Sequence, residues 1–240
     1  MTLSRRRVRA VFRKELREYR HNGNIIYAMG ILPLVFILQP LIQVFALPAS
    51  ASGSVRHQHS LLYMLAIPVL VPATLAAYSV VGERLQGTLE PLLSTPVRRE
   101  ELLLGKALAA FVPSVVVAYG VFAVFIAIVE LFAAPAVATA LIRTPDVLAQ
   151  LVFTPFLATW SIWVGIAVSV KSSDPRIAGQ LSILVSLPTV AVTTLIAFNV
   201  IPSTLGVAVG LGVGLLVLVR LGGHVASHLF DRERLITSTK

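Results

Sequence analysis

The sequence predicts an all-α, polytopic membrane protein with six transmembrane helices, and three observations predict this class. First, 56% of the 240 residues are hydrophobic and only 13% are charged, whereas a soluble domain carries about 25% charged residues. Second, six stretches are long and apolar enough to cross the hydrocarbon core, which takes about 20 helical residues. Third, the charged and turn-forming residues gather between those stretches. The length fits a single domain over residues 1–240.

The six predicted spans follow one another with short connections. They are residues 24–46, 61–82, 105–132, 147–170, 177–200 and 204–222. The first five contain proline, which removes one backbone hydrogen bond from a helix. We therefore expect kinked helices whose freed carbonyl groups find other partners, an arrangement that membrane proteins tolerate.

Residues 4–22 form a strongly basic segment before the first span. Val8, Val11, Phe12, Leu16 and Tyr19 recur at helical spacing, and arginines cover the other face. This pattern predicts an amphipathic helix that lies in the membrane interface with its cations near anionic lipid headgroups. A solvated cytoplasmic helix would show the same pattern, so that alternative stays open.

The distribution of basic residues predicts the orientation of the chain. If the N-terminus is cytoplasmic, 18 of the 20 Lys and Arg residues lie on the cytoplasmic side, and only Arg56 and Arg143 lie outside. Basic residues are enriched in cytoplasmic segments of membrane proteins. We therefore expect both termini in the cytoplasm, with residues 223–240 as a cytoplasmic tail. The net charge of +9 then reflects topology, and we expect no nucleic-acid partner.

The sequence carries no recognisable catalytic, metal or nucleotide site. The segment "LLLGK" ends like a nucleotide-binding loop, but Glu100 stands at its first glycine position and Ala107 replaces the Ser or Thr. We predict that the histidine pairs at residues 57 and 59 and at residues 224 and 228 are surface residues without a functional role, because two ligands do not make a metal site. The spans are almost free of ionisable groups, which ion-coupled transporters place at mid-membrane. We expect no enzyme activity and no cofactor on this chain.

The most elaborate polar segment is the loop over residues 83–104, within "ERLQGTLEPLLSTPVRREELLLGK". It predicts two short helices, one from about Thr88 through Leu93 and one from Pro96 with Thr95 as its N-cap. Leucines on the first helix form an apolar stripe outside the membrane. Such a stripe suits a hydrophobic groove on a partner or the bilayer surface, and the residues alone favour neither.

This segment resembles the signature of type 2 ABC exporter permeases, with an E-R-x-x-G-T-L-E-x-L-L-x-T-P core followed by E-L-L-L-G-K. The resemblance extends to the basic N-terminal helix, the six spans and the cytoplasmic termini. It implies a pair of permease subunits, identical or paralogous, and two copies of a separate ATPase that binds ATP and Mg²⁺. It also implies that the loop is a coupling helix that docks into the ATPase. The setting would be the plasma membrane of a prokaryote.

The resemblance assigns roles to eight residues of the loop. In this assignment Gly87 and Thr88 open the coupling helix, while Glu83 and Arg84 lock the inner end of the second span. The ATPase-docking face comprises Leu89, Glu90, Leu92 and Leu93. One departure from the family is the short "FNVIPST" connection between spans five and six, which suggests a simpler outer gate.

The family places the cargo pathway between the two permeases, lined largely by spans one, two and five. On span five a polar stripe at i, i+4, i+7 and i+11 comprises Ser182, Ser186, Thr189 and Thr193, with Gln180 near its inner end. On span one, Gln39 and Gln43 share a face. These residues are pathway candidates. However, Ser and Thr hydroxyls also donate hydrogen bonds to carbonyl groups on the preceding turn of their own helix or join neighbouring helices. We expect the glycine ladder of span six, at residues 206, 210 and 214, to be a packing face.

These features favour the membrane subunit of an ATP-driven exporter. The route has few charges, so a small amphipathic or lipophilic cargo is favoured, with multidrug or antibiotic efflux as the leading activity. Export of a lipid-linked glycan or of ions by the same family is the alternative. A channel or secondary transporter, or a membrane assembly factor, is a further alternative from another class.

Overall fold

The computed structural model describes residues 3–46, 59–88, 95 and 97–230. The described residues are helical, and they contain no strand. The helices are α1 (Arg5–His21), α2 (Gly23–Ala46), α4 (Ser60–Tyr63), the 3-10 helix η2 (Met64–Ala66), α5 (Ile67–Leu85), α7 (Arg99–Phe132), α8 (Pro135–Leu141), α9 (Thr144–Lys171), α10 (Pro175–Ala197) and α11 (Leu205–Leu229).

Six of these segments are long and apolar enough to cross a membrane, which confirms the predicted all-α class with six spans. The elements α4, η2 and α5 together form the second span, Ser60–Leu85. Two boundaries differ from the prediction by more than three residues. The third span begins at Arg99 rather than at residue 105, and the sixth continues to Leu229 rather than ending at residue 222. The short helix α8 is an element that the sequence did not predict.

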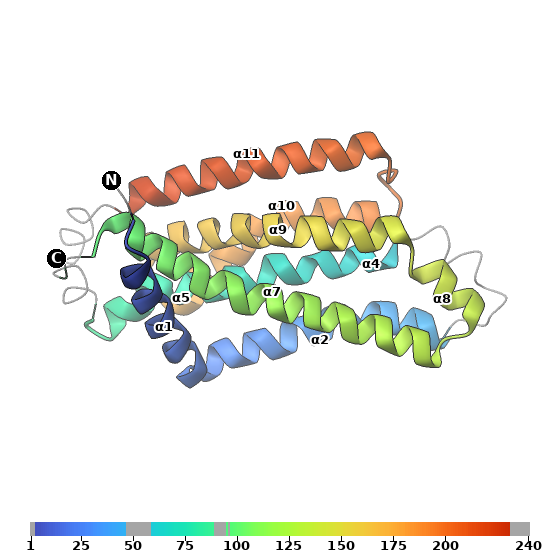
Figure 1. Cartoon of the computed structure of the whole chain (residues 1–240), viewed down its shortest axis with the longest axis horizontal. Coiled ribbons are helices and arrows are strands. Elements are labelled where there is room, and N and C mark those ends of the chain that lie inside the picture. The colour runs from blue at the N-terminus through green and yellow to red at the C-terminus, as the bar shows by residue number, and fades with distance from the viewer. Residues whose placement is uncertain (1–2, 47–58, 89–94, 96, 231–240) are drawn as a thin grey trace.

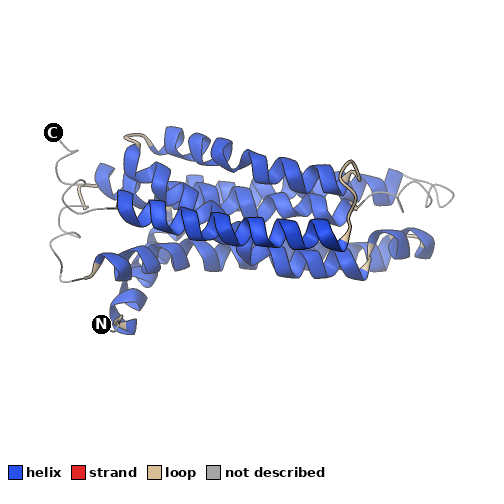
Figure 2. Ribbon diagram, turned by 90° about the horizontal axis from the view of Figure 1, so that it is seen from above, coloured by secondary structure: helices blue, strands red, loops and turns tan. Residues whose placement is uncertain are grey.

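The six long helices run roughly antiparallel in one elongated bundle (Figures 1 and 2). Helix α1 lies across one end of this bundle, together with the end of α5 and the start of α7; we call this the α1 end (Figure 1). Helix α8 lies at the opposite end, together with α4 and the connection from α10 to α11; we call this the α8 end (Figure 1). The end of α11 returns to the α1 end, as an even number of spans requires.

Helix α5 is the centre of the bundle. It is almost wholly buried and packs against α2, α7, α9 and α10. A Cβ atom built on Gly165 of α9 would lie 2.6 Å from Cβ of Ala76 and 2.9 Å from the carbonyl oxygen of Ala73. Only glycine therefore permits this close crossing of α5 and α9, an arrangement that membrane helices use to gain packing contacts.

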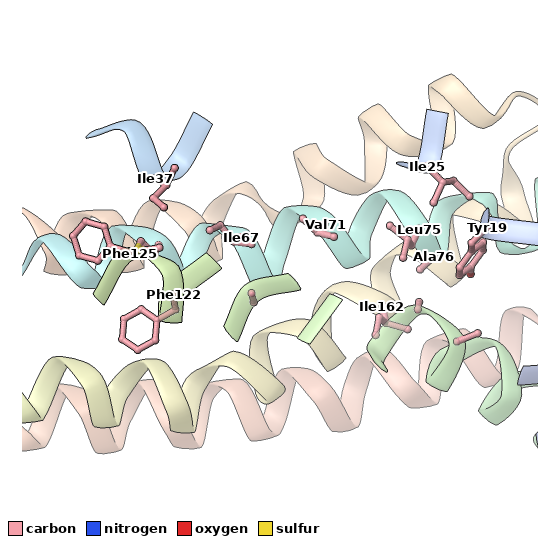
Figure 3. Packing of buried hydrophobic residues seen from close by; sticks show 14 of the residues in the cluster. Tyr19, Ile25, Ile37, Ile67, Val71, Leu75, Ala76, Phe122, Phe125 and Ile162 are labelled. Carbon is pink, nitrogen blue, oxygen red and sulfur yellow. The ribbon is translucent and has the colours of Figure 1, made fainter. Parts of the chain in front are cut away.

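The largest hydrophobic cluster joins α1, α2, α5, α7 and α9 along the bundle (Figure 3). Phe122 and Phe125 of α7 lie near Ile37 and Ile67, toward one part of the cluster, while Tyr19, Ile25 and Leu75 lie in another (Figure 3). These contacts combine helices far apart in sequence, so α1 is packed onto the bundle rather than standing apart from it.

Helix α11 lies at the edge of the bundle and packs mainly against α9. Its glycine ladder does not form the packing face that the sequence suggested. A Cβ atom built on Gly210 or Gly214 meets no described atom within 4 Å. The close contacts of α11 occur instead at Gly222 and Gly223, which lie against Trp160 and Trp163. An added Cβ at Gly222 would lie 3.0 Å from Cβ of Trp163, which is a tight approach, whereas one at Gly223 would lie 3.5 Å from the Trp163 ring, which is ordinary contact.

Candidate functional site

The end of α5 is closed by a glycine turn. Gly87 has a φ of +67°, which glycine adopts without steric cost. Its N–H donates to the carbonyl of Arg84 at 3.2 Å, and the N–H of Thr88 donates to the carbonyl of Glu83 at 3.0 Å. This pair of bonds is the Schellman pattern that ends helices. Gly87 and Thr88, which the resemblance assigns to the opening of the coupling helix, thus form the turn that ends α5.

The predicted docking face lies outside the described residues. It comprises Leu89, Glu90, Leu92 and Leu93. The described residues do show how the chain re-enters the bundle. The predicted helix from Pro96 with Thr95 as its N-cap is wrong in its start, because the next helix is α7, which begins at Arg99 with Arg98 as its N-cap.

Glu101 explains why α7 starts at Arg99. Its carboxylate accepts a hydrogen bond from the N–H of Arg98 at 3.0 Å, which is the bond between the N3 side chain and the N-cap backbone in a capping box. The same carboxylate accepts from the N–H of Ser4 at 2.8 Å and pairs with Arg7 at 3.4 Å. The start of α7 is therefore attached to the start of α1.

A buried ion cluster of Lys14, Glu15, Glu83 and Lys106 holds three helices together at the α1 end. The Lys106 ammonium lies 2.7 Å from Oε1 of Glu15 and 3.0 Å from Oε1 of Glu83, and it donates to the carbonyl of Ser79 at 2.6 Å. Lys14 reaches the same oxygen of Glu83 at 2.5 Å. Among these four residues two cations face two carboxylates. Lys106 donates hydrogen bonds to Glu15 and to the carbonyl of Ser79, while Oε2 of Glu83 has no hydrogen-bond partner among the described residues. Buried charges are tolerated when they are paired.

Burial and charge act in opposite directions on the groups at this cluster. Burial lowers the pKa of Lys14, but the Glu83 carboxylate, with Glu15 and Glu18, raises it more, and the pKa ends well above its usual value. Burial raises the pKa of Glu15 against the opposing effect of Lys106. Burial, with the neighbouring carboxylates, also raises the pKa of Tyr19. At neutral pH Lys14 is therefore an ammonium ion and Tyr19 a neutral phenol.

Arg84 connects the same end of α5 to a different helix. Its guanidinium donates to the carbonyl of Ser172 at 2.9 Å and to that of Val170 at 3.2 Å. These carbonyls belong to the C-terminal turn of α9, where helices leave acceptors unsatisfied and favour a positive charge. Glu83 thus contacts α1 and α7 while the next residue contacts α9. The sequence suggested that both residues lock this end of the second span, and these contacts describe how they can do so.

The buried pair of Glu15 and Lys106, to which Glu83 also belongs, was not predicted from the sequence. A signal for them was present: Glu15 lies on the apolar face of the N-terminal helix, and Lys106 stands inside an otherwise apolar stretch. A single charge in such a position usually has a buried partner of opposite sign. The pairing itself needed the structure, because the two residues lie 91 positions apart.

The predicted pathway residues fall in different environments. Ser182, Ser186 and Thr193 are buried inside the chain, whereas Gln180 is exposed. The hydroxyls of Ser182 and Thr193 donate to carbonyls on the preceding turn, those of Ala178 and Val190. Thr189, half-buried, donates to the carbonyl of Ser186. The hydroxyls of Ser182, Thr189 and Thr193 are therefore satisfied within α10, whereas that of Ser186 lies 3.4 Å from the hydroxyl of Ser161 on α9. Ser182, Ser186 and Thr193 are buried in the bundle.

The glutamines of α2 differ from that stripe. Gln39 is half-buried, and its side-chain oxygen has no hydrogen-bond partner. Gln43 lies in α2, but its side chain is outside the described residues. An unpartnered amide in an apolar setting is costly, so the Gln39 position is consistent with either a partner molecule or a polar route.

Helix α9 carries a buried polar line that the sequence analysis did not single out. It comprises Asp146, Gln150, Thr154, Ser161 and Ser169. Ser161 donates to the carbonyl of Val69 and lies 3.4 Å from the hydroxyl of Ser186. Both amide atoms of Gln150 and the hydroxyl of Thr154 have no partner. The line thus faces α5 and α10, and its middle holds polar groups with unused hydrogen-bonding capacity.

At the α8 end, His59 is not the surface decoration that the sequence suggested. Its Nδ1 lies 2.7 Å from Oδ1 of Asp146, and its Nε2 lies 2.6 Å from Oγ of Ser203. These three residues, the His59 cluster, connect α4, α9 and the turn before α11. Beside them lies a cavity of about 110 Å³ with walls that include Phe153, Thr193 and Leu211. The described residues contain no group of three or more potential metal ligands of the His, Cys, Asp and Glu types.

Six helices that are long and apolar enough to span a membrane fit a multi-pass membrane protein. The chain matches the family model described as ABC-2 family transporter protein over residues 9–218, and it therefore belongs to the ABC-2 type transporter permease family. The predicted resemblance is confirmed. This family is a transmembrane subunit and not the ATPase, and membership implies association with an ABC ATPase subunit. No curated protein matches the chain.

Proposed function

We propose that this permease subunit forms the export route for a small amphipathic or lipophilic compound, with drug or antibiotic efflux as the favoured activity. One observation carries this proposal: charged side chains gather at the two ends of the bundle, and the polar groups between them are uncharged. The α9 and α10 hydroxyls and the Gln150 amide are the principal members. Such a route disfavours a bare ion, which needs charged or closely spaced carbonyl ligands.

Export would be driven by two copies of a separate ATPase, with ATP and Mg²⁺ bound there and not on this chain. A second permease, identical or paralogous, would complete the route. The geometry on both sides of the loop supports this coupling. The loop leaves the bundle at Glu83 and Arg84, which contact α1, α7 and α9, and returns at Glu101, which is bonded to α1. A displacement of the loop would therefore act directly on α1, α5, α7 and α9.

The orientation belongs to the same proposal. We infer that the α1 end faces the cytoplasm of a prokaryotic cell, in the plasma membrane, because basic residues concentrate there. The chain has no cysteine, so single cysteines report topology without background. A cysteine replacing Ser52 should react with an impermeant maleimide from outside intact cells, and one replacing Ser173 should not. The reverse pattern would contradict the orientation.

Export of a lipid-linked glycan is the second candidate within the family. The half-buried Gln39, whose amide oxygen lacks a partner, favours it in one respect, because a sugar offers hydroxyl groups to such an acceptor. The proposed route, however, is lined mostly by single hydroxyl groups that already donate to carbonyl groups of their own helix. A channel or an assembly factor is disfavoured by the family match.

The test replaces one leucine of the proposed docking face. Leu89→Asp should weaken ATPase binding by at least about tenfold, because burying a leucine is worth roughly 1.5–3 kcal/mol and about 1.4 kcal/mol is tenfold in affinity. Leu3→Asp is the matched control, since Leu3 is an exposed leucine near α1. Pull-down of the ATPase and efflux of a lipophilic dye are measured at equal expression. If Leu89→Asp binds the ATPase and exports the dye as the parent does, the loop is not the element that couples the ATPase to the permease.

A further inference from the structure

A groove of about 1030 Å³ lies between α1, α2 and α7, near the α1 end. One wall is cationic: Arg13, Arg17 and Arg20 stand one turn or less apart along α1, followed by His21. The spacing of i, i+4 and i+7 places the three arginines on one face of the helix. All three are exposed, and this face points away from the buried face of α1.

The other wall of the groove is apolar and belongs to the membrane-spanning helices. Ile26 and Met29 of α2 and Pro113 of α7 line it, with Leu16 of α1. Ile26 is 54% exposed, so this wall offers open apolar surface to an occupant. The groove therefore joins a cationic part on a surface helix to an apolar part on two spans.

The charges of this groove are not compensated by the protein. Among the described residues, no carboxylate pairs with Arg13, Arg17 or Arg20, and no acidic side chain lines the groove. Lys14, on the same helix, differs, because it is bound to Glu18 and Glu83. The acidic side chains near α1 thus pair with the lysines of the ion cluster. The arginines of the groove are therefore available to an external anion.

We propose that this groove binds an anionic phospholipid, whose phosphate contacts the three arginines while an acyl chain lies along Ile26, Met29 and Pro113. Guanidinium groups form paired hydrogen bonds with phosphate oxygens, and an acyl chain covers apolar surface that a free phosphate would leave open. The site rests on the proposed position of α1 in the membrane interface. Tyr19 lies one turn from Glu15 and also lines the groove, so a bound lipid would strengthen the hold of α1 on the ion cluster.

The test is native mass spectrometry of the isolated chain in a non-ionic detergent, titrated with dioleoyl phosphatidylglycerol. The groove variant is Arg13→Gln/Arg17→Gln. The control is Arg6→Gln/Arg176→Gln, which removes the same charge at exposed positions outside the groove. We expect the groove variant to bind the first lipid at least about tenfold more weakly, and the control within about twofold of the parent.

A second variant tests the apolar wall separately. Ile26→Ser should weaken phosphatidylglycerol binding while its melting temperature in detergent stays close to that of the parent, because Ile26 is exposed. Dioleoyl phosphatidylcholine should bind more weakly than phosphatidylglycerol, and inorganic phosphate should not displace the lipid at equal concentration.

Three results would overturn the site. They are equal losses in the groove and control variants, equal binding of phosphatidylcholine, or full displacement by inorganic phosphate. Each is measured without an ATPase or a cargo, so failure here leaves the proposed export function untouched. A failed ATPase pull-down, in turn, leaves the lipid measurement valid.

Discussion

The two ends of the bundle are held by different polar chemistry. At the α1 end, buried Glu15, Glu83 and Lys106, together with the partly exposed Lys14, link α1, α5 and α7. At the α8 end, a single histidine links α4, α9 and the turn before α11 through Asp146 and Ser203. The first arrangement has several ionic contacts that share atoms, and the second has one contact on each ring nitrogen. We therefore expect the α1 end to be the fixed end of the bundle and the α8 end to open more easily.

The largest expected effect comes from removing Lys106. In Lys106→Met, the carboxylates of Glu15 and Glu83 stay buried with Lys14 as their only cation in the cluster. Breaking a buried ion pair by removing one partner costs about 3–5 kcal/mol. We expect a loss of this size in the free energy of unfolding, measured by denaturant titration in mixed micelles. Lys171→Met, at an exposed position, should change it by no more than about 0.5 kcal/mol.

A double mutant tests whether Lys106 and Glu15 are energetically coupled. Lys106→Met/Glu15→Gln removes one charge of each sign, so less uncompensated charge remains than in Lys106→Met alone. We expect the double mutant to be more stable than the sum of the single effects predicts, with a coupling energy of about 0.5–3 kcal/mol. Additive effects would mean that the two residues are neighbours without an energetic link.

Loss of Arg84 should have an intermediate effect, concentrated on α9. Arg84→Gln removes the charged donor from the last carbonyls of that helix, and a hydrogen bond to a charged group contributes about 1.5–3 kcal/mol. Hydrogen exchange should therefore speed up in residues 168–172. Arg176→Gln, at an exposed position at the same end, should leave that exchange unchanged. Equal protection in both variants would contradict the capping role.

The smallest expected effect is at the α8 end. His59→Gln keeps a side chain that can donate to Asp146 while it shortens the reach to Ser203, so we expect a loss of about 1 kcal/mol. Exchange should increase at the starts of α4 and α9, and the α1 end should stay protected. If His59→Gln destabilises the chain as much as Lys106→Met, the distinction between a fixed and an opening end is wrong.

The number and approximate limits of the spans could be predicted from the sequence, because a membrane span is defined by local length and hydropathy. The start of α7 was misplaced because Glu101 takes its partners from Arg98 and from Ser4, and the second of these is distant in sequence. The glycine ladder of α11 was misassigned for a similar reason. Spacing shows that close approach is possible, whereas the Trp160 and Trp163 side chains decide where it occurs.

The candidate site was only half predictable. The motif contains Glu83, Arg84 and Lys106, but it does not show that Lys106 pairs with Glu83. The other partners, Lys14 and Ser172, lie elsewhere in the chain. A polar stripe such as Ser182 and Ser186 has a defined periodicity, but periodicity does not say whether the stripe faces a second subunit or the interior. Here Ser182 and Ser186 face the interior and lie beside α9, whose own polar line recurs at intervals of 4, 4, 7 and 8 residues and so shares one helix face.

We expect Glu83 to transmit an ATPase contact on the loop to α1 and α7, and the variant Glu83→Gln separates this coupling from ATPase binding. Glu83→Gln leaves the proposed docking leucines unchanged but weakens the ionic contacts with Lys14 and Lys106. Efflux of a lipophilic dye and pull-down of the ATPase are measured on the same membranes at equal expression. The account predicts ATPase binding within about twofold of the parent and export reduced by at least about tenfold. Parental export by Glu83→Gln, or a loss of export fully explained by a loss of ATPase binding, would contradict it.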